Sequence, residues 1–141
     1  MTVNQILNNK GKDIYSILST ITVFEALKVM GEKNIGAVLI VEDSVLKGIL
    51  SERDYARKIV LKDKSSKETS VGEIMEKDLI TVKLSDNIDY CMEIMTNNKI
   101  RHLPVLENNA VVGLISMGDV VKAIIENQKD TINHLNTYIS Q

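Results

Sequence analysis

The residues best suited to chemistry in this sequence are a serine and an aspartate three positions apart, and the pair occurs twice. Ser51 and Asp54 follow an aliphatic run that ends at Leu50, and Ser116 and Asp119 stand 65 positions later in the same setting. Where such a segment opens a helix, the carboxylate can accept hydrogen bonds from two neighbouring hydroxyls of a sugar. The serine hydroxyl and unpaired backbone N–H groups can meet phosphate oxygens. One short segment could therefore hold two parts of a nucleotide.

The duplication extends well beyond this pair. Residues 48–54 and 113–119 share a glycine, two aliphatic residues, the serine and the aspartate at matching positions. Residues 3–7 resemble residues 71–75 at an offset of 68, so the first copy has three extra residues near positions 8–12. Two copies are too few for an open solenoid, which needs about three. We therefore expect a closed pair of related domains.

Composition excludes several classes of protein. The 141 residues fit one compact unit. A net charge of −2 gives no general attraction to nucleic acids or anionic membranes, and no apolar run approaches the roughly 20 residues that cross a bilayer. Neither partner is expected. The N-terminus does not resemble a secretory signal, so a cytoplasmic location is predicted.

Metal and disulfide chemistry are also not expected. Cys91 is the only cysteine, so it cannot form an intramolecular disulfide, and it lies in an apolar helical pattern typical of a buried position. With only His102 and His134 besides, no zinc-ligand spacing exists. We predict no metal site.

The apolar periodicity predicts the order strand, helix, strand, strand, helix in each repeat. In the first, Thr20 or Thr22 caps a helix, residues 35–41 and 45–50 form a hairpin, and a helix follows Ser51.

The second repeat replays this order. Its predicted strands cover residues 79–82, 103–106 and 111–115, and Asp86 is the expected helix N-cap. The predicted boundaries are residues 2–62 for the first repeat, 63–69 for a solvated linker, 70–127 for the second repeat and 128–141 for an amphipathic helix.

Two tandem β-α-β-β-α repeats with these motifs, and with Ile-x-x-Leu-Pro-Val at residues 100–105, resemble the cystathionine-β-synthase (CBS) domain pair, or Bateman module. The match covers about residues 2–127. The resemblance implies an α/β (α+β) fold of two pseudo-symmetric repeats packed through their sheets, and pairs that commonly form homodimers. It also implies clefts between repeats for AMP, ADP, ATP, S-adenosylmethionine or NADH.

The same resemblance implies which residues share a cleft. The first cleft would combine Ser51, Arg53 and Asp54 with Ile80, Arg101, His102 and Pro104. The second would combine Ser116 and Asp119 with Tyr15, Ile35, Gly36 and Ala37. Up to three cations surround the first cleft, and charge-assisted hydrogen bonds are about twice as strong as neutral ones. The second relies on Ser116 and backbone donors, so we expect it to bind more weakly, to prefer an uncharged adenosine-like ligand, or to stay empty.

The same residues could have structural roles instead of binding a ligand. Asp54 and Asp119 could be carboxylates that stabilise helix N-termini by about 0.3 to 1 kcal/mol each, and both serines are natural N-caps. Arg101 could be a surface residue and His102 a structural histidine. Tyr15 could be a strand residue, Ile80 a core residue and Pro104 an edge-strand residue. Gly48 and Gly113 would serve backbone conformation or close packing.

The function expected from this pattern is a stand-alone regulatory module that binds an adenine nucleotide, requires no cofactor and signals to an effector protein. Catalysis is not expected, because no nucleophile–base pair, metal cluster or glycine-rich phosphate loop stands out. One alternative is an enzyme with adenosyl chemistry of its own. Another is an interaction module whose clefts are vestigial.

Overall fold

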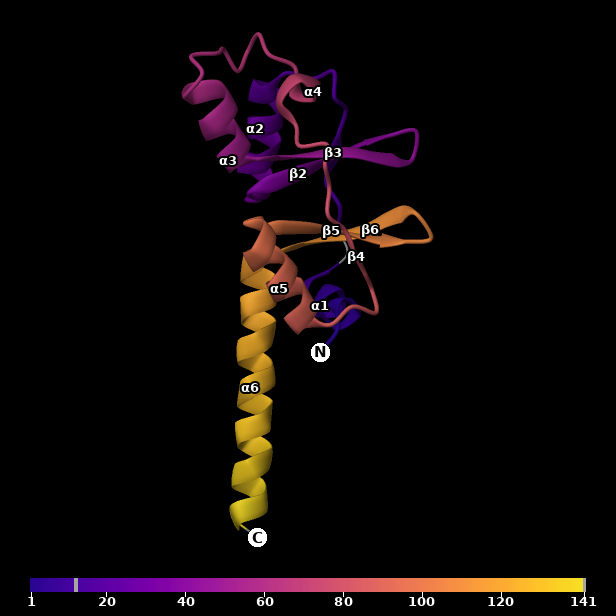
Figure 1. Ribbon diagram of the computed structural model, residues 1–141, viewed down its shortest axis with the longest axis vertical. Coiled ribbons are helices and arrows are strands. Elements are labelled where there is room, and N and C mark those ends of the chain that lie inside the picture. The colour runs from indigo at the N-terminus through magenta and orange to yellow at the C-terminus, as the bar shows by residue number, and fades with distance from the viewer. Residues whose placement is uncertain (12, 141) are drawn as a thin grey trace. The chain divides into compact units, whose positions relative to one another are not determined.

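The computed structural model describes residues 1–11 and 13–140, and the chain divides into two compact units (Figure 1). The first, called the repeat-1 unit, is Ile14–Leu79. The second, called the repeat-2 unit, combines Met1–Asp13 with Ile80–Gln141. The N-terminal segment therefore belongs to the unit that contains the second repeat.

The repeat-1 unit has a three-stranded sheet with helices. Its elements are β1 (Ser16–Ile17), α2 (Val23–Lys33), β2 (Ala37–Glu42), β3 (Val45–Ser51), α3 (Glu52–Tyr55), the π-helical turn η1 (Ala56–Val60) and α4 (Val71–Ile74). The strand order is β1-β2-β3, with β1 parallel and β3 antiparallel to β2. The predicted order of elements is confirmed for this repeat.

The repeat-2 unit has the same sheet topology. Its elements are α1 (Val3–Lys10), β4 (Val82–Lys83), α5 (Ile88–Asn98), β5 (His102–Glu107), β6 (Ala110–Ser116) and α6 (Met117–Ser140). β4 lies parallel to β5 and β6 lies antiparallel to it. The α/β fold of two related repeats is thus confirmed.

Local sequence explains how the elements begin and turn. The Thr22 hydroxyl accepts a hydrogen bond from the Glu25 N–H at 3.1 Å, so Thr22 rather than Thr20 caps α2. The β2–β3 turn holds Asp43 and Ser44 at φ 52° and 64°. Two successive positive φ values are typical of the type I′ turns that suit tight hairpins. The β5–β6 turn repeats this with Asn108 and Asn109 at φ 50° and 65°.

Several sequence-based boundaries were wrong. The strand predicted at residues 79–82 covers only Val82–Lys83. The N-cap of α5 is Asn87, whose side chain accepts from the Tyr90 N–H at 2.8 Å, whereas Asp86 accepts from the Lys83 N–H. Asp86 therefore closes the preceding turn instead of capping the helix.

Pro104 lies in the middle strand of its sheet, not in an edge strand. It stands opposite Leu114 of β6, while the pairing with β4 begins only at Val105. In the repeat-1 unit the matching residue, Leu39, donates its N–H to the Tyr15 carbonyl. Proline has no N–H to donate, so this bond is missing in the repeat-2 unit. The strand tolerates proline because the pairing with β4 starts one residue later than the pairing of β1 with β2.

The segment predicted as a solvated linker is anchored to α2. Thr69 is buried, and its hydroxyl donates to the Ser65 carbonyl at 2.7 Å. The Phe24 N–H donates to the Ser66 carbonyl, and the Lys67 ammonium lies 4.9 Å from the centre of the Phe24 ring. These contacts hold the segment against the start of the helix.

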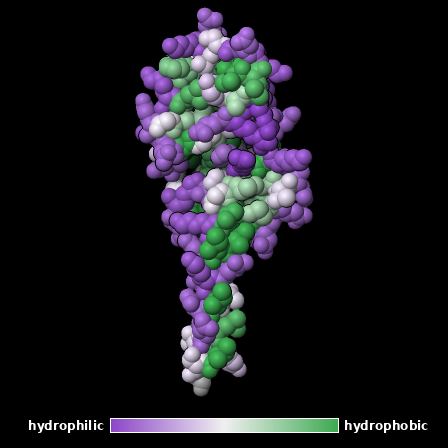
Figure 2. All heavy atoms as spheres, turned by 90° about the vertical axis from the view of Figure 1, so that its left-hand side faces the viewer, coloured by the Kyte–Doolittle hydropathy of each residue, from purple (hydrophilic) through white to green (hydrophobic). Residues whose placement is uncertain are grey.

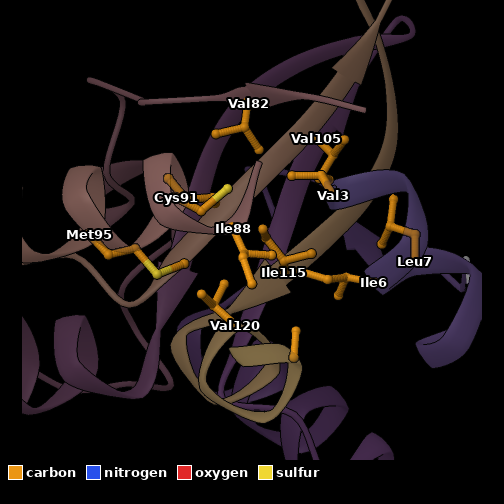
Figure 3. Packing of buried hydrophobic residues seen from close by; sticks show 12 residues of the cluster. Val3, Ile6, Leu7, Val82, Ile88, Cys91, Met95, Val105, Ile115 and Val120 are labelled. Atoms are coloured by element: carbon orange, nitrogen blue, oxygen red, sulfur yellow. The ribbon is translucent and has the colours of Figure 1, made fainter. Parts of the chain in front are cut away.

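The lead-in of each repeat packs on the sheet of the other repeat. Val3, Ile6 and Leu7 of α1 are buried with Ile115 and Val120 in the repeat-2 unit (Figure 3). Val71 and Ile74 of α4 are likewise buried in the repeat-1 unit. The two lead-in helices are therefore exchanged between the repeats, which is why the compact units do not follow the sequence repeats.

Two glycines permit this exchange. A Cβ on Gly113 would lie 2.7 Å from Leu7 Cδ1, and a Cβ on Gly48 would lie 2.8 Å from Met75 Sδ and 2.9 Å from the Glu76 carbonyl oxygen. All three distances are shorter than van der Waals contact. Of the two roles expected for Gly48 and Gly113, the structure therefore shows close packing.

Cys91 is fully buried among aliphatic side chains, as predicted. Burial, and next the negative charge of Asp86, raise the pKa of the thiol to about 11. The thiol therefore stays protonated at neutral pH and acts as a small apolar side chain.

α6 is one continuous helix, so the tail predicted as a separate element from residue 128 is its second half. Val120 and Ala123 are buried, but an apolar stripe along the helix is exposed (Figure 2). The stripe consists of Val121, Ile125, Ile132, Leu135 and Ile139. Below, this set is called the α6 stripe.

Candidate ligand-binding site

The first Ser-x-x-Asp motif forms the junction between β3 and α3. Ser51 ends the strand and caps the helix, with its hydroxyl accepting from the Asp54 N–H at 3.1 Å. Asp54 Oδ2 accepts from the Ser51 N–H and from the Ser51 hydroxyl, both at 3.0 Å. This reciprocal pattern is a capping box. The structural role considered from sequence is therefore present, and it fixes the orientation of the carboxylate.

A lysine completes this motif. Lys58 Nζ lies 3.2 Å from Asp54 Oδ1 and donates to the Ile74 carbonyl at 2.8 Å. Lys58 is four residues after Asp54, a spacing at which helical side chains meet. Sequence reasoning missed this residue although the spacing was a usable signal.

The second motif forms the junction between β6 and α6 in the same way. Asp119 Oδ2 accepts from the Ser116 N–H at 2.8 Å, and the Asp119 N–H donates to the Ser116 hydroxyl at 3.1 Å. Burial acts to raise the pKa of Asp119. Hydrogen bonds from Lys10 and Ser116, with the charge of Lys10, outweigh burial and hold the pKa below its usual value. The carboxylate is therefore ionised at neutral pH.

Lys10 is the cation of this second motif. Its Nζ lies 2.6 Å from Asp119 Oδ2 and donates to the Leu114 carbonyl at 2.7 Å. The sequence had suggested that Ser116 and backbone donors act alone here. Lys10 was missed because it stands 109 positions before Asp119, and only the fold of α1 brings it there. It lies in the short insertion that distinguishes the first repeat.

The strand residues named from sequence lie beside the motif of their own unit. Ala37 is the cross-strand partner of Ser51, and His102 is the partner of Ser116. Backbone hydrogen bonds also connect the start of each helix with the residue before the strand. The Glu52 N–H donates to the Gly36 carbonyl at 3.1 Å, and the Met117 N–H donates to the Arg101 carbonyl at 2.8 Å. Each unit thus brings one strand start to one helix start.

The named residues divide cleanly between the units. The repeat-1 unit contains Ser51, Arg53, Asp54, Tyr15, Ile35, Gly36 and Ala37. The repeat-2 unit contains Ser116, Asp119, Ile80, Arg101, His102 and Pro104. Each predicted cleft draws on both sets, so its composition stays a prediction.

Solvent exposure separates polar candidates from packing residues. Arg101 is exposed, and Arg53, Asp54 and His102 are partly buried, as suits side chains that could meet a ligand. Ile80 packs against the core of its unit. Tyr15 also packs against a core, with the Lys33 ammonium 5.3 Å from the centre of its ring. A packing role is therefore established for these two.

Among residues 1–11 and 13–140, no group of three or more histidine, cysteine, aspartate or glutamate residues could hold a metal ion. In that part of the chain, no helix has the length and apolar character needed to span a membrane.

The fold and its duplicated motif place the chain in a known class of protein. The sequence model of the CBS domain matches residues 6–61 and again residues 71–126, and the chain belongs to the CBS domain family. The resemblance inferred from the motifs is therefore confirmed.

Particular relatives can be named. The chain is 39% identical over 147 residues to "CBS domain-containing protein CBSX3, mitochondrial" of Arabidopsis thaliana, covering 98% of this chain and 71% of that protein. It is 31% identical to "CBS domain-containing protein YhcV" of Bacillus subtilis (strain 168), covering 76% of each.

Solved structures of proteins with CBS domains have the same fold as this chain. A protein with CBS domains from Burkholderia ambifaria MC40-6 has a TM-score of 0.87 and 46% identity, covering 91% of this chain and 96% of that one. The CBS domain pair of protein MJ0100, in complex with 5′-methylthioadenosine and S-adenosylmethionine, has a TM-score of 0.78 and 26% identity, covering 88% and 99%. CBS domain pairs are modules that generally bind adenosine ligands.

Proposed function

We propose that this chain is a regulatory module that binds an adenine nucleotide of the AMP, ADP or ATP type, with Ser51, Arg53 and Asp54 as central contacts. One observation carries the proposal: a Ser-x-x-Asp motif is built at a strand–helix junction in both units, with the same backbone hydrogen bonds. MJ0100, a relative with this fold, holds adenosyl ligands. The shared geometry supports a shared type of ligand.

The capping box leaves room for a ligand on Asp54. Two carboxylate oxygens offer about four acceptor positions. The cap and Lys58 use three of them through Ser51 N–H, Ser51 hydroxyl and Lys58 Nζ. Ribose hydroxyls could take the fourth position and displace the Ser51 hydroxyl, which would then turn towards a phosphate. Arg53 would add a charge-assisted hydrogen bond to that phosphate.

Arg101, His102 and Pro104 of the other unit, with Ile80, are the further contacts proposed for this ligand. For the second motif, the proposed contacts besides Ser116 and Asp119 are Tyr15, Ile35, Gly36 and Ala37. These assignments rest on the family resemblance. S-adenosylmethionine and NADH are the alternative ligands.

The specific rival is an interaction module in which both motifs serve only as helix caps. The complete capping box and the ion pair at Asp54 favour it, because they give the repeated pattern a structural use without a ligand. The rival predicts no stabilisation by any adenosyl compound.

We propose a regulatory role rather than catalysis, because the residue types of the motif suit binding a ligand better than activating one. A ligand would favour one arrangement of the chain through its higher affinity for that arrangement, and an effector protein would respond. Cytoplasm is the location proposed from sequence, although the relative CBSX3 has mitochondrial in its name.

The α6 stripe supports a homodimer. Its members are spaced by four, seven, three and four residues, which is a heptad pattern. Ile132 and Leu135 are 55% and 56% exposed, and a helix of this kind gains most of its stability from packing. We propose that α6 of a second copy covers it.

The experiment that tests nucleotide binding is a thermal-shift and calorimetric panel of AMP, ADP, ATP, S-adenosylmethionine, 5′-methylthioadenosine and NADH. A ligand at 100 times its dissociation constant should stabilise the protein by about 2.7 kcal/mol. Asp54→Asn keeps the size of the side chain but removes its charge, and should weaken nucleotide binding by about tenfold or more.

Asp89→Asn is the matched control. Asp89 is an exposed aspartate in the first turn of α5, so the same substitution there changes a helix-terminal charge outside the motif. It should leave binding unchanged. If no compound of the panel binds, or if the two variants behave alike, the nucleotide proposal is refuted.

A further inference from the structure

The ion pair at each motif is built from a different part of the chain. In the repeat-1 unit the lysine is Lys58, four residues after Asp54. The position of the second repeat that matches Lys58 is Ala123, which is buried and carries no charge. Lys10, from the end of α1, supplies the lysine there instead. Lys10 lies in the insertion of the first repeat, so the second lead-in has no matching residue.

The same electrostatic arrangement is thus present twice, without the same residues. A shared ancestry of the repeats explains why serine and aspartate recur, because they occupy matching positions. Shared ancestry does not explain the two lysines, because they do not occupy matching positions of the repeats. A requirement common to both motifs, namely a cation on the aspartate, does explain them.

Stability is a weak reason for that requirement. The side chains of Lys10 and Asp119 are 38% and 24% exposed, and ion pairs near the surface contribute only about 0 to 1 kcal/mol. The charge of an unpaired Asp119 has a larger effect on a ligand, because it would repel any phosphate bound by the neighbouring serine and backbone. Close charges in a partly buried site interact more strongly than charges in water.

We propose that Lys10 is a specificity-determining residue of the Ser116–Asp119 motif: by neutralising Asp119, it allows this motif to take an adenosyl ligand that carries phosphate. The inference rests on the proposed function and revises one part of it, since this motif had been expected to suit an uncharged ligand. Of the three N–H donors of its ammonium, two have protein acceptors among the described residues, Asp119 and the Leu114 carbonyl. The third can face a ligand oxygen.

The test compares AMP with adenosine, which differ only by the phosphate. Binding is measured by calorimetry in an Asp54→Asn background, so that the second motif dominates. Lys10→Met keeps the apolar length of the side chain and removes the charge. AMP affinity should fall by about tenfold, while adenosine affinity should change less than twofold. Lys10→Arg should restore the preference for AMP.

Lys129→Met is the matched control, because Lys129 is an exposed residue of α6 remote in sequence from the motif. It should leave both affinities unchanged. Equal losses for AMP and adenosine in Lys10→Met would show a merely structural role and overturn the inference. An unchanged preference for AMP over adenosine in Lys10→Met would also overturn the inference. Loss of all binding in Asp54→Asn alone would overturn it as well. In each of these cases the proposed function would still stand, provided that the wild-type protein binds the nucleotide. If the wild type binds neither compound, the inference is overturned, and if it binds no other compound of the panel either, the proposed function fails with it.

Discussion

Single residues decide whether the lead-in helices can dock. Gly113 and Leu7 lie so close that any added Cβ would overlap the leucine side chain. The sequence marks Gly113 as the start of a repeated motif, but nothing in it identifies Leu7 as the neighbour. The reason for the glycine is a contact between residues more than one hundred positions apart.

We expect Gly113→Ala to destabilise the protein by about 1 to 3 kcal/mol, as overpacked cores do. Chemical denaturation measures the change. Gly31→Ala is the control, since Gly31 lies within α2 and a Cβ there meets nothing within 4 Å. It should be neutral or stabilise by about 0.5 to 1 kcal/mol. Combining Gly113→Ala with Leu7→Ala should give a cost well below the sum of the two single changes. Additive costs would contradict the contact.

The ionised Asp119 predicts a pH dependence of stability. Its pKa in the folded protein is lowered, with burial opposed by the hydrogen bonds and charge of Lys10. The stabilising contribution is therefore fully present above the unfolded-state pKa of about 3.9 and is lost as the pH falls through the folded-state value. Asp119→Asn should cost stability at pH 7 and cost progressively less below about pH 4.

The measurement is the free energy of unfolding of both proteins across that range. Asp89→Asn is again the control, since Asp89 is exposed and outside the motif. A constant difference between wild type and Asp119→Asn from pH 7 to pH 3 would contradict the ionised pair.

At the scale of elements, α6 combines two roles in one helix. Its first two turns carry Asp119 and bury Val120 and Ala123, and its exposed side presents the α6 stripe from Val121 to Ile139. The sequence predicted both patterns but separated them at residue 128. It did so because no residue near that position signals continuity, whereas the structure shows one unbroken helix.

Leu135→Asn should weaken self-association by about tenfold or more, because it places an amide in the apolar seam proposed between two copies. Sedimentation equilibrium measures the effect. Thr137→Asn is the control: Thr137 lies two residues away, outside the α6 stripe, so the same new side chain should have little effect. A monomeric wild-type protein, or equal behaviour of the two variants, would contradict a dimer through α6.

Other elements show why sequence reasoning succeeded for the fold and stopped short of the site. Aliphatic runs and capping residues are local signals, so the hairpins and the order of elements could be predicted. The reach of Lys10 to Asp119 is not local. The anchoring of residues 63–69 also depends on where α2 lies. Such contacts follow from packing, which no short window of sequence encodes.

At the scale of the whole molecule, the sequence repeats and the compact units have different boundaries. The repeats are read from sequence as 2–62 and 70–127, but the compact units exchange their lead-in segments. The pairing of sequence copies therefore identified the motifs, whereas the compact units place α1 with the second repeat and α4 with the first. Both CBS domain matches begin inside those exchanged segments or at their edge.

The exchange also has a consequence for how the chain folds during synthesis. α1 leaves the ribosome before the strand and helix that bury Val3 and Leu7 are made. Contacts of such large sequence separation form slowly, because the loop they close costs conformational entropy. The repeat-1 unit can complete its core once residue 79 has emerged. α1 must wait, with its apolar face unburied, until β6 and the start of α6 have been made.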